Sequence, residues 1–253
     1  MVPSNFHTHT HFCDGKDTPE DIVREAIRLG CPAVGFSGHG FTLYDRTYCM
    51  SLEATEAYCA EISRLKKIYR DKIKIYLGLE KDYYSQEDTS RYDYIIGSVH
   101  YVNKNGIYLA IDNNEEEFLW VVGNYYGGDF YALAEAYYEN VGNVYEKTHC
   151  NIIGHFDLVT KYNEKNKYFD VYHPRYVAAA RKALNKLLPS PAYFEINSGA
   201  ISRGCRTTPY PDDRWLSLIK EAGHPILYTS DSHAKETLLF GLPEDAPLPD
   251  FAR

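Results

Sequence analysis

The first residues in the sequence that could do chemistry are two histidines spaced two apart, in the run His7-Thr8-His9. In an extended strand, the side chains of residues i and i+2 point to the same face. Two imidazoles on one face can bind a single cation at metal–nitrogen distances of about 2.0–2.1 Å. Asp14 follows in a turn, where its carboxylate suits either a further ligand or an ordinary turn residue. On its own, this segment is compatible with a metal site or with ordinary polar side chains.

Further histidines and carboxylates follow short apolar runs along the rest of the chain. One such residue is commonly an ordinary hydrogen-bonded side chain, but the same pattern repeated after successive runs indicates a shared site. The candidate metal ligands are His7, His9, Asp14, His39, Glu80, His100, His155, Asp231 and His233.

This ligand set is larger than one ion uses, and it suits two or three adjacent divalent ions with Glu80 as a shared carboxylate. Imidazole and carboxylate ligands without thiolate suit Zn, Fe or Mn. Ions about 3.5–4 Å apart can polarise a phosphoryl group and hold a hydroxide for in-line attack. The ligand types therefore suit metal-assisted hydrolysis, for which a phosphate ester is one possible class of substrate.

An alternation of strands and helices must position these residues. Expected strands are Asn5–His9, Ala33–Ser37, Lys74–Leu79, Asp93–Gly97, Asn151–Gly154, Tyr193–Ile196 and Ile226–Thr229. Expected helices are one between the N-cap Thr18 and a stop at Gly30, then Leu52–Arg70, parts of Glu115–Tyr126, Tyr131–Thr148, Arg175–Leu188 and Asp213–Glu221. Such alternation indicates parallel β/α units, in an open sheet or a closed barrel. Because polar residues follow nearly every strand, and all strand ends of a barrel meet at one mouth, an α/β fold of the distorted seven-stranded barrel type is expected.

The composition narrows the class of protein. The chain has 253 residues, of which 44% are hydrophobic, and a formal net charge of −8. That charge argues against nucleic-acid binding, which requires clustered Lys and Arg. The apolar stretches are too short to span a membrane, and the N-terminus lacks the features of a signal peptide. The six cysteines form no CxxC pair and suggest reduced thiols, so a cytoplasmic protein with one domain over residues 1–253 is expected.

The order of these motifs resembles the PHP (polymerase and histidinol phosphatase) superfamily. The motifs span residues 7 to 233 and are most similar to the histidinol-phosphatase branch. They are His7-Thr8-His9-Thr10 with Asp14-Gly15, Gly35-Phe36-Ser37-Gly38-His39, Gly78-Leu79-Glu80, Gly97-Ser98-Val99-His100, Gly154-His155-Phe156-Asp157 and Ser230-Asp231-Ser232-His233. The resemblance implies a distorted (β/α)7 barrel of PHP type with a trinuclear metal centre.

The resemblance also implies how the ligands divide among the ions. One ion is held by His7, His9, Glu80 and Asp231, a second by Glu80, His100 and His155, and a third by Asp14, His39 and His233. The family often places the acidic or histidine ligand of the first motif slightly further along the chain than Asp14.

Two basic residues are implied to bind the phosphate of the substrate. Lys161 and Arg203 would otherwise be ordinary surface charges, but the resembling branch carries basic phosphate-binding residues in the same two loops. Arg203 can offer a bidentate fork to the phosphoryl oxygens. With Arg203, Asp231 and His233 are the expected catalytic residues. The proton donor to the leaving alcohol is metal-bound water, His233 or Asp231, and the sequence does not decide among them.

The implied activity is hydrolysis of L-histidinol phosphate to L-histidinol and phosphate by a metal-bound hydroxide, as in histidine biosynthesis. The alternative within the family is a phosphoesterase acting on another small phosphate ester, such as a nucleotide or a sugar phosphate. A polymerase-associated exonuclease and a metal-binding barrel without activity are further alternatives. The long segment Tyr101–Thr148 is expected to fold as helices beside the mouth, and the oligomeric state stays open.

Overall fold

The sheet that carries the candidate residues is entirely parallel. The computed structural model describes residues 2–252, so the two terminal residues of the domain expected over 1–253 lie outside the described residues. Within that range the sheet has the order β1-β2-β3-β6-β7-β8. Its strands are β1 (Ala33–Phe36), β2 (Lys74–Asp82), β3 (Tyr94–Ser98), β6 (Ile152–Ile153), β7 (Tyr193–Asn197) and β8 (Ile226–Thr229). The expected parallel β/α order is confirmed.

The segment of residues 5–9 joins the two edges of this curled sheet. Asn5 forms a parallel bridge with Val34 of β1, and Thr8 forms one with Ser232 beyond β8. The prediction of a regular strand at Asn5–His9 is therefore wrong, because this segment makes only single bridges and pairs with a different neighbour at each end. The Asn5 side chain also donates hydrogen bonds locally, to the His7 carbonyl and the Thr8 hydroxyl, both at 2.9 Å. The distorted barrel itself is confirmed.

Most of the helices lie where the pattern predicts them. The longer ones are α1 (Pro19–Leu29), α2 (Leu52–Ile68), α3 (Glu115–Tyr125), α4 (Phe130–Thr148), α5 (Pro174–Leu187) and α7 (Asp213–Glu221). Helix α1 begins after Thr18, whose side chain accepts a hydrogen bond from the Asp21 amide, and ends at Gly30, whose φ is 81°. The short elements are η1 (Leu158–Thr160), η2 (Glu164–Asn166), α6 (Gly199–Ser202), η3 (Lys235–Thr237) and η4 (Asp250–Ala252).

The beginning of the segment Tyr101–Thr148 is a hairpin, which corrects the expectation of helices there. Strand β4 (Tyr101–Lys104) pairs antiparallel with β5 (Ile107–Ala110). The two-residue turn is Asn105-Gly106, with φ angles of 54° and 85°. Both residues are in the left-handed region that a tight hairpin turn requires and that Asn and Gly tolerate best. The expected helices follow as α3 and α4.

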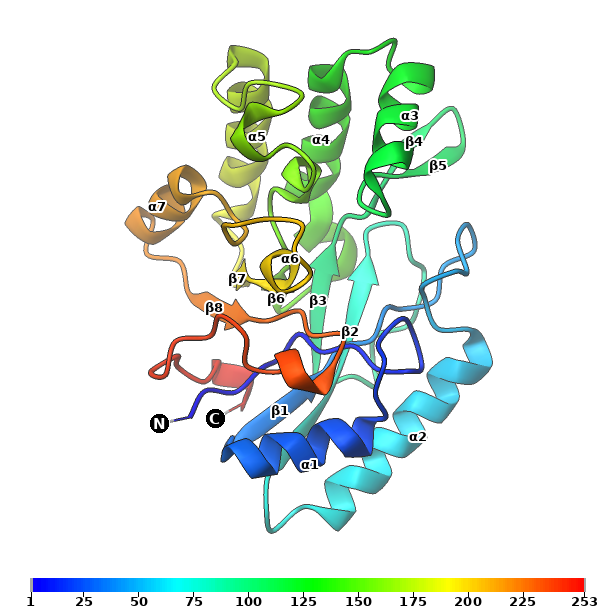
Figure 1. Cartoon of the computed structure of the whole chain (residues 1–253), viewed down its shortest axis with the longest axis vertical. Coiled ribbons are helices and arrows are strands. Elements are labelled where there is room, and N and C mark those ends of the chain that lie inside the picture. Colours follow the sequence, from blue (N-terminus) through cyan, green and yellow to red (C-terminus); the bar gives the residue numbers. More distant parts are fainter. Residues whose placement is uncertain (1, 253) are drawn as a thin grey trace.

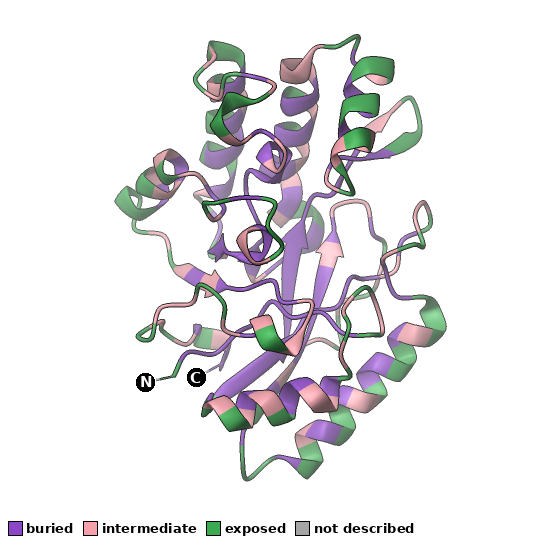
Figure 2. Ribbon diagram, in the orientation of Figure 1, coloured by how far each residue is buried: buried purple, intermediate pink, exposed green. Residues whose placement is uncertain are grey.

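The helices pack around the sheet and leave one of its ends open for a site. In Figure 1, α1 and α2 lie at one end of the view and α3, α4 and α5 at the other, with the sheet between them. Figure 2 shows that the strands of the sheet are mostly buried, with partly buried residues in β2 and β8, and that the outer faces of these helices are exposed. The amino ends of the strands are covered by the C-terminal segment, where the Phe251 ring stacks 5.1 Å from Tyr94. Among residues 2–252, no helix combines the length and the apolar character needed to cross a bilayer.

Candidate metal centre

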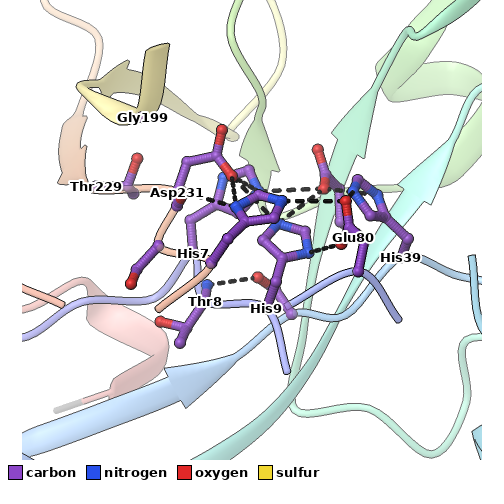
Figure 3. Close-up of polar contacts among 12 residues, drawn as sticks. His7, Thr8, His9, His39, Glu80, Gly199, Thr229 and Asp231 are labelled. Carbon is purple, nitrogen blue, oxygen red and sulfur yellow. Dashed lines mark hydrogen bonds and ion pairs between the residues drawn. The ribbon is translucent and has the colours of Figure 1, made fainter. Parts of the chain in front are cut away.

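The nine sequence-predicted ligands come together at the carboxyl end of the sheet. His7 and His9 lie in the segment that joins the sheet edges, Glu80 lies within β2, and the others lie in the loops that follow the strands. Figure 3 shows His7, His9, His39, Glu80 and Asp231 with their polar atoms pointing toward one another. Every one of the nine lies within 3.7 Å of another, measured between a ring nitrogen and a carboxylate oxygen.

Glu80 is at the centre of this arrangement. Its Oε2 atom lies 3.2 Å from His7 Nε2, 3.4 Å from His9 Nε2 and 3.0 Å from His39 Nδ1. The Glu80 side chain is only 1% exposed, so this oxygen is shielded from solvent. One carboxylate oxygen therefore faces three imidazoles, two from the segment of residues 5–9 and one from the loop after β1.

The second oxygen of Glu80 faces a different pair of histidines. Its Oε1 atom lies 3.4 Å from His100 Nε2 and 3.2 Å from His155 Nε2. It also accepts a hydrogen bond from the Ser98 hydroxyl at 2.6 Å, which fixes the plane of the carboxylate. Glu80 thus spans two groups of imidazoles, which is the position that a bridging ligand between two ions requires.

Asp14 forms a third group with histidines on the outer side of the cluster. His233 Nε2 lies 3.2 Å from Asp14 Oδ2, and His39 Nε2 lies 3.7 Å from the same atom. His9 also approaches this group, with Nδ1 3.6 Å from Asp14 Oδ1. His9 and His39 therefore face Asp14 with one ring nitrogen and Glu80 with the other, so the groups are less separate than the resemblance implies.

Asp231 closes the cluster on the side of β8. Its Oδ1 atom lies 3.2 Å from His9 Nε2 and 3.6 Å from His7 Nε2. The backbone of Asp231 has a φ of 47°, in the left-handed region that residues other than Gly adopt uncommonly and that Asp tolerates better than most. Gly199 lies against it, and a Cβ atom at residue 199 would be 2.7 Å from the Asp231 Cβ. The absence of a side chain at Gly199 allows the carboxylate to take this position.

The hydrogen bonding of the cluster tests whether these residues fit metal ions. Among residues 2–252, no hydrogen bond of acceptable geometry reaches the buried atoms His7 Nε2, His9 Nε2 and Glu80 Oε2, although the two nitrogens lie 3.2 and 3.4 Å from that oxygen. Buried polar atoms without a partner are costly, and native proteins nearly always satisfy them. Three sets of ligand atoms lie within 4.8 Å of one another: His9, Asp14, His39 and His233; His7, His9 and Glu80; and His39, Glu80 and His100. Imidazole and carboxylate groups in this arrangement fit divalent metal ions.

The electrostatics of the cluster favour charged carboxylates. Burial alone would raise the pKa of Glu80, but the neighbouring His7 and His39 lower it well below its ordinary value. Burial would likewise raise the pKa of Asp231, and Arg203 and His7 lower it. For His9, burial and the charges of His233 and His39 lower the pKa to about 3. Burial would also lower the pKa of His7, but Glu195 and Glu80 raise it well above its ordinary value.

Two buried carboxylates outside the nine orient the histidines. Glu195 Oε1 lies 2.5 Å from His7 Nδ1, and Glu195 Oε2 accepts a hydrogen bond from the His155 amide at 2.8 Å. Asp82 Oδ2 accepts from the His100 amide at 3.0 Å. Neither is among the site residues predicted from the sequence, although Glu195 is one of the polar residues that mark the ends of the expected strands. Asp82 lies two residues after Glu80 in β2, and Glu195 lies in the middle of β7. The sequence signal that could have identified them is a carboxylate on the side of the strand that faces the inside of the barrel.

Arg203 reaches the cluster, whereas Lys161 is held at its edge. Arg203 Nη2 donates to Asp231 Oδ2 at 3.0 Å, and Nη1 donates to the Asp231 carbonyl at 2.9 Å and lies 3.0 Å from His233 Nδ1. Lys161 Nζ donates to the Asp112 carbonyl at 2.5 Å and lies 3.4 Å from its Oδ2 atom. Both cations line the same cavity, so both are placed to meet an anion there.

The cluster forms the floor of a cavity of about 220 Å³. Its floor includes His39, Glu80, His100, His155, Asp231 and His233. Its walls come from the loop between β1 and α2, the start and end of the β4–β5 hairpin, and the loops that carry Lys161 and Arg203. A cavity with a metal-binding floor and two cations in its wall is suited to a small phosphate ester.

The comparison with known proteins agrees with this class of site: the chain belongs to the PHP domain family, which matches residues 5–199. It is similar to the histidinol-phosphatase of Bacillus subtilis, at 28% identity over 92% of this chain and 94% of that protein. It is also similar to the solved histidinol phosphate phosphatase of Lactococcus lactis complexed with zinc, L-histidinol and phosphate, at 25% identity and a TM-score of 0.63, over 92% of this chain and 86% of that chain. A solved structure from Listeria monocytogenes has the same fold, with a TM-score of 0.80 at 23% identity, over 94% of this chain and 98% of that chain.

Proposed function

We propose that this protein is a metal-dependent phosphatase that hydrolyses L-histidinol phosphate to L-histidinol and phosphate. The observation that carries the proposal is the position of Glu80, whose two oxygens face five histidines in a buried cluster with unpartnered ligand atoms. The names of the relatives from Bacillus subtilis and Lactococcus lactis support this choice of substrate.

The proposed metal ligands are the nine residues of the cluster. They would hold two or three ions, with Glu80 as the shared ligand. Zinc is the ion we favour, because the Lactococcus lactis relative was solved with it, and Fe and Mn stay alternatives. One set comprises His7, His9, Glu80 and Asp231, a second comprises Glu80, His100 and His155, and a third comprises Asp14, His39 and His233. When bound, such ions supply positive charge to a phosphoryl group and lower the pKa of water.

The residues of the chain itself bind and orient the phosphate. Arg203 lies at the rim of the cluster, and its guanidinium contacts Asp231 and His233. In this position it can stabilise the negative charge that develops on the phosphoryl oxygens. Asp231 and His233 hold that guanidinium in place, in addition to their proposed roles as ligands. Lys161 adds a second positive charge to the lining of the cavity.

The experiment that tests the substrate is phosphate release from L-histidinol phosphate, compared with a panel of nucleotide and sugar phosphates. The protein would be assayed with zinc present, and kcat/KM would be measured for each ester. We expect histidinol phosphate to be preferred by more than about tenfold, since each well-placed polar contact discriminates by at least that factor. Equal activity on all esters would still support a phosphatase of this family, but it would show that L-histidinol phosphate is not its specific substrate. A cytoplasmic location and the absence of a nucleic-acid partner stay predictions from the composition.

A further inference from the structure

One wall of the cavity presents a carboxylate to the open space above the cluster. Asp45, Thr47 and Tyr48 line the cavity from the loop between β1 and α2, and Tyr101 lines it from β4. Asp45 Oδ1 accepts hydrogen bonds from the Thr47 amide at 2.9 Å and from the Thr47 hydroxyl at 2.7 Å. Asp45 Oδ2 accepts from the Tyr101 hydroxyl at 2.5 Å. Three donors from two separate elements therefore hold this carboxylate in one orientation.

The charge of Asp45 is not balanced by a neighbouring cation. The other acids that line the cavity all face one: Asp14 and Glu80 face histidines, Asp231 faces Arg203, and Asp112 lies 3.4 Å from Lys161. Among residues 2–252, no Lys, Arg or His nitrogen lies within 4.0 Å of the Asp45 carboxylate, whose partners are all neutral. Asp45 thus contributes a fixed negative charge to the wall of a cavity whose floor is built to bind an anion.

Aromatic rings connect this carboxylate with the cluster. The Tyr48 ring lies 4.7 Å from the His39 ring and 6.0 Å from the Tyr101 ring, which is nearly parallel to it. Tyr101 directly follows His100 in the sequence, so the residue that holds Asp45 is adjacent to one that faces Glu80. A carboxylate beside tyrosine rings is an environment that favours an organic cation, through ion pairing and through the negative face of the rings.

We infer that Asp45 binds the protonated amine of the leaving alcohol and so selects phosphate esters of amino alcohols. The inference rests on the proposed function, because it assumes that the phosphate is bound at the cluster. In histidinol phosphate the ammonium group is on the carbon next to the one that bears the phosphate oxygen. With the phosphate bound at the cluster, the ammonium group therefore lies above the cluster, in the cavity that Asp45 lines. Sugar phosphates and nucleotides carry no such cation in that place, and a fixed carboxylate gives them no gain.

The test compares D45N with wild type on two substrates, L-histidinol phosphate and p-nitrophenyl phosphate, whose leaving alcohol has no cation. The assay is run near pH 8, where an imidazole of ordinary pKa, about 6.5, is neutral and the amine is the remaining cation. Asn at this position keeps the shape of Asp and can still accept from the Thr47 amide. We expect D45N to lower the ratio of the two kcat/KM values about tenfold, mainly by raising KM for histidinol phosphate.

The matched control is D71N, which also removes one negative charge but lies at an exposed site, with 87% of its side chain accessible, outside the cavity. We expect D71N to keep the wild-type ratio of the two kcat/KM values. If D45N also keeps that ratio, or lowers both activities equally, the inference is wrong and Asp45 only holds its loop. If wild type hydrolyses p-nitrophenyl phosphate but not histidinol phosphate, it is the proposed substrate that fails.

Discussion

Glu195 Oε1 lies 2.5 Å from His7 Nδ1, while His7 Nε2, on the other side of the ring, lies 3.2 Å from Glu80 Oε2. Both the His7 and the Glu195 side chains are fully buried. A carboxylate that accepts from one ring nitrogen orients the imidazole and directs the lone pair of the other nitrogen into the site. The Thr229 hydroxyl also donates to Glu195 at 2.5 Å, so the carboxylate is itself fixed. Glu195 is thus a positioning residue for His7.

The variant E195Q tests this positioning role. The amide keeps the size of the side chain but removes its charge, and we expect zinc affinity to fall about tenfold or more. The affinity would be measured by competition with a chelator of known affinity. The control E139Q changes an exposed glutamate that pairs with Lys182 on the outer surface. Equal zinc affinity in E195Q and wild type would show that Glu195 has no part in metal binding.

The variant E80Q removes the charge of the central carboxylate. An amide can no longer balance two groups of imidazoles, so we expect fewer zinc ions per chain and a loss of kcat/KM of about a hundredfold or more. Metal content would be determined by elemental analysis of the purified variant, in parallel with the rate of phosphate release. A variant with full metal content and normal activity would contradict the position assigned to Glu80 in the proposed centre.

The variant G199A tests the close approach of Gly199 to Asp231. A methyl group at this position would lie 2.7 Å from two side-chain atoms of Asp231, so one of the residues must move. We expect a loss of about 1–3 kcal/mol in the free energy of unfolding, together with lower activity. Urea denaturation gives the stability of the metal-free protein. The control G123A lies in α3, where no atom of residues 2–252 beyond its chain neighbours and the backbone of the helix comes within 4 Å of the added methyl group, and we expect it to gain up to about 1 kcal/mol. A stable and active G199A would show that Asp231 has room to move.

The two basic residues of the cavity are expected to contribute differently to phosphate binding. Arg203 hydrogen-bonds Asp231 within the cluster itself, whereas Lys161 donates to the carbonyl of Asp112, which is not one of the nine candidate ligands. We therefore expect R203K to weaken inhibition by inorganic phosphate about tenfold or more, because lysine cannot reproduce the guanidinium fork. The loss in K161Q should be smaller. Inhibition constants for phosphate measured on both variants decide the order, and a larger loss in K161Q would reverse the assignment.

Much of the site could be predicted from the sequence because its residues follow the strands that place them. Glu80 and His155 each end an apolar run, and a parallel barrel brings such ends to one mouth. The role of Asp14 is harder to predict from the sequence, because a carboxylate in a turn gives the same sequence pattern whether it caps the turn or faces a site. The structure brings it to 3.2 Å from His233, which is 219 residues away along the chain and could not be matched with it by spacing.

Other features depend on contacts that no local pattern carries. The hairpin turn Asn105-Gly106 has a local signal, but the tyrosines of its strands read equally well as a helix face. Glu195 in β7 lies among apolar neighbours, and its role appears only when His7 is placed against it. Asp45 lies in an irregular loop, and only the fold brings it to Tyr101. That the chain is a single domain stays a prediction.

The most direct test of the account is a zinc titration of the metal-free protein, with phosphate release from L-histidinol phosphate measured at each step. Chelation removes the metal, and bound zinc is determined in the same samples. We expect no activity without metal, and a rate that rises with bound zinc and saturates at two or three ions per chain. Full activity in the metal-free protein, or saturation with zinc without any hydrolysis, would contradict a metal-dependent histidinol phosphatase.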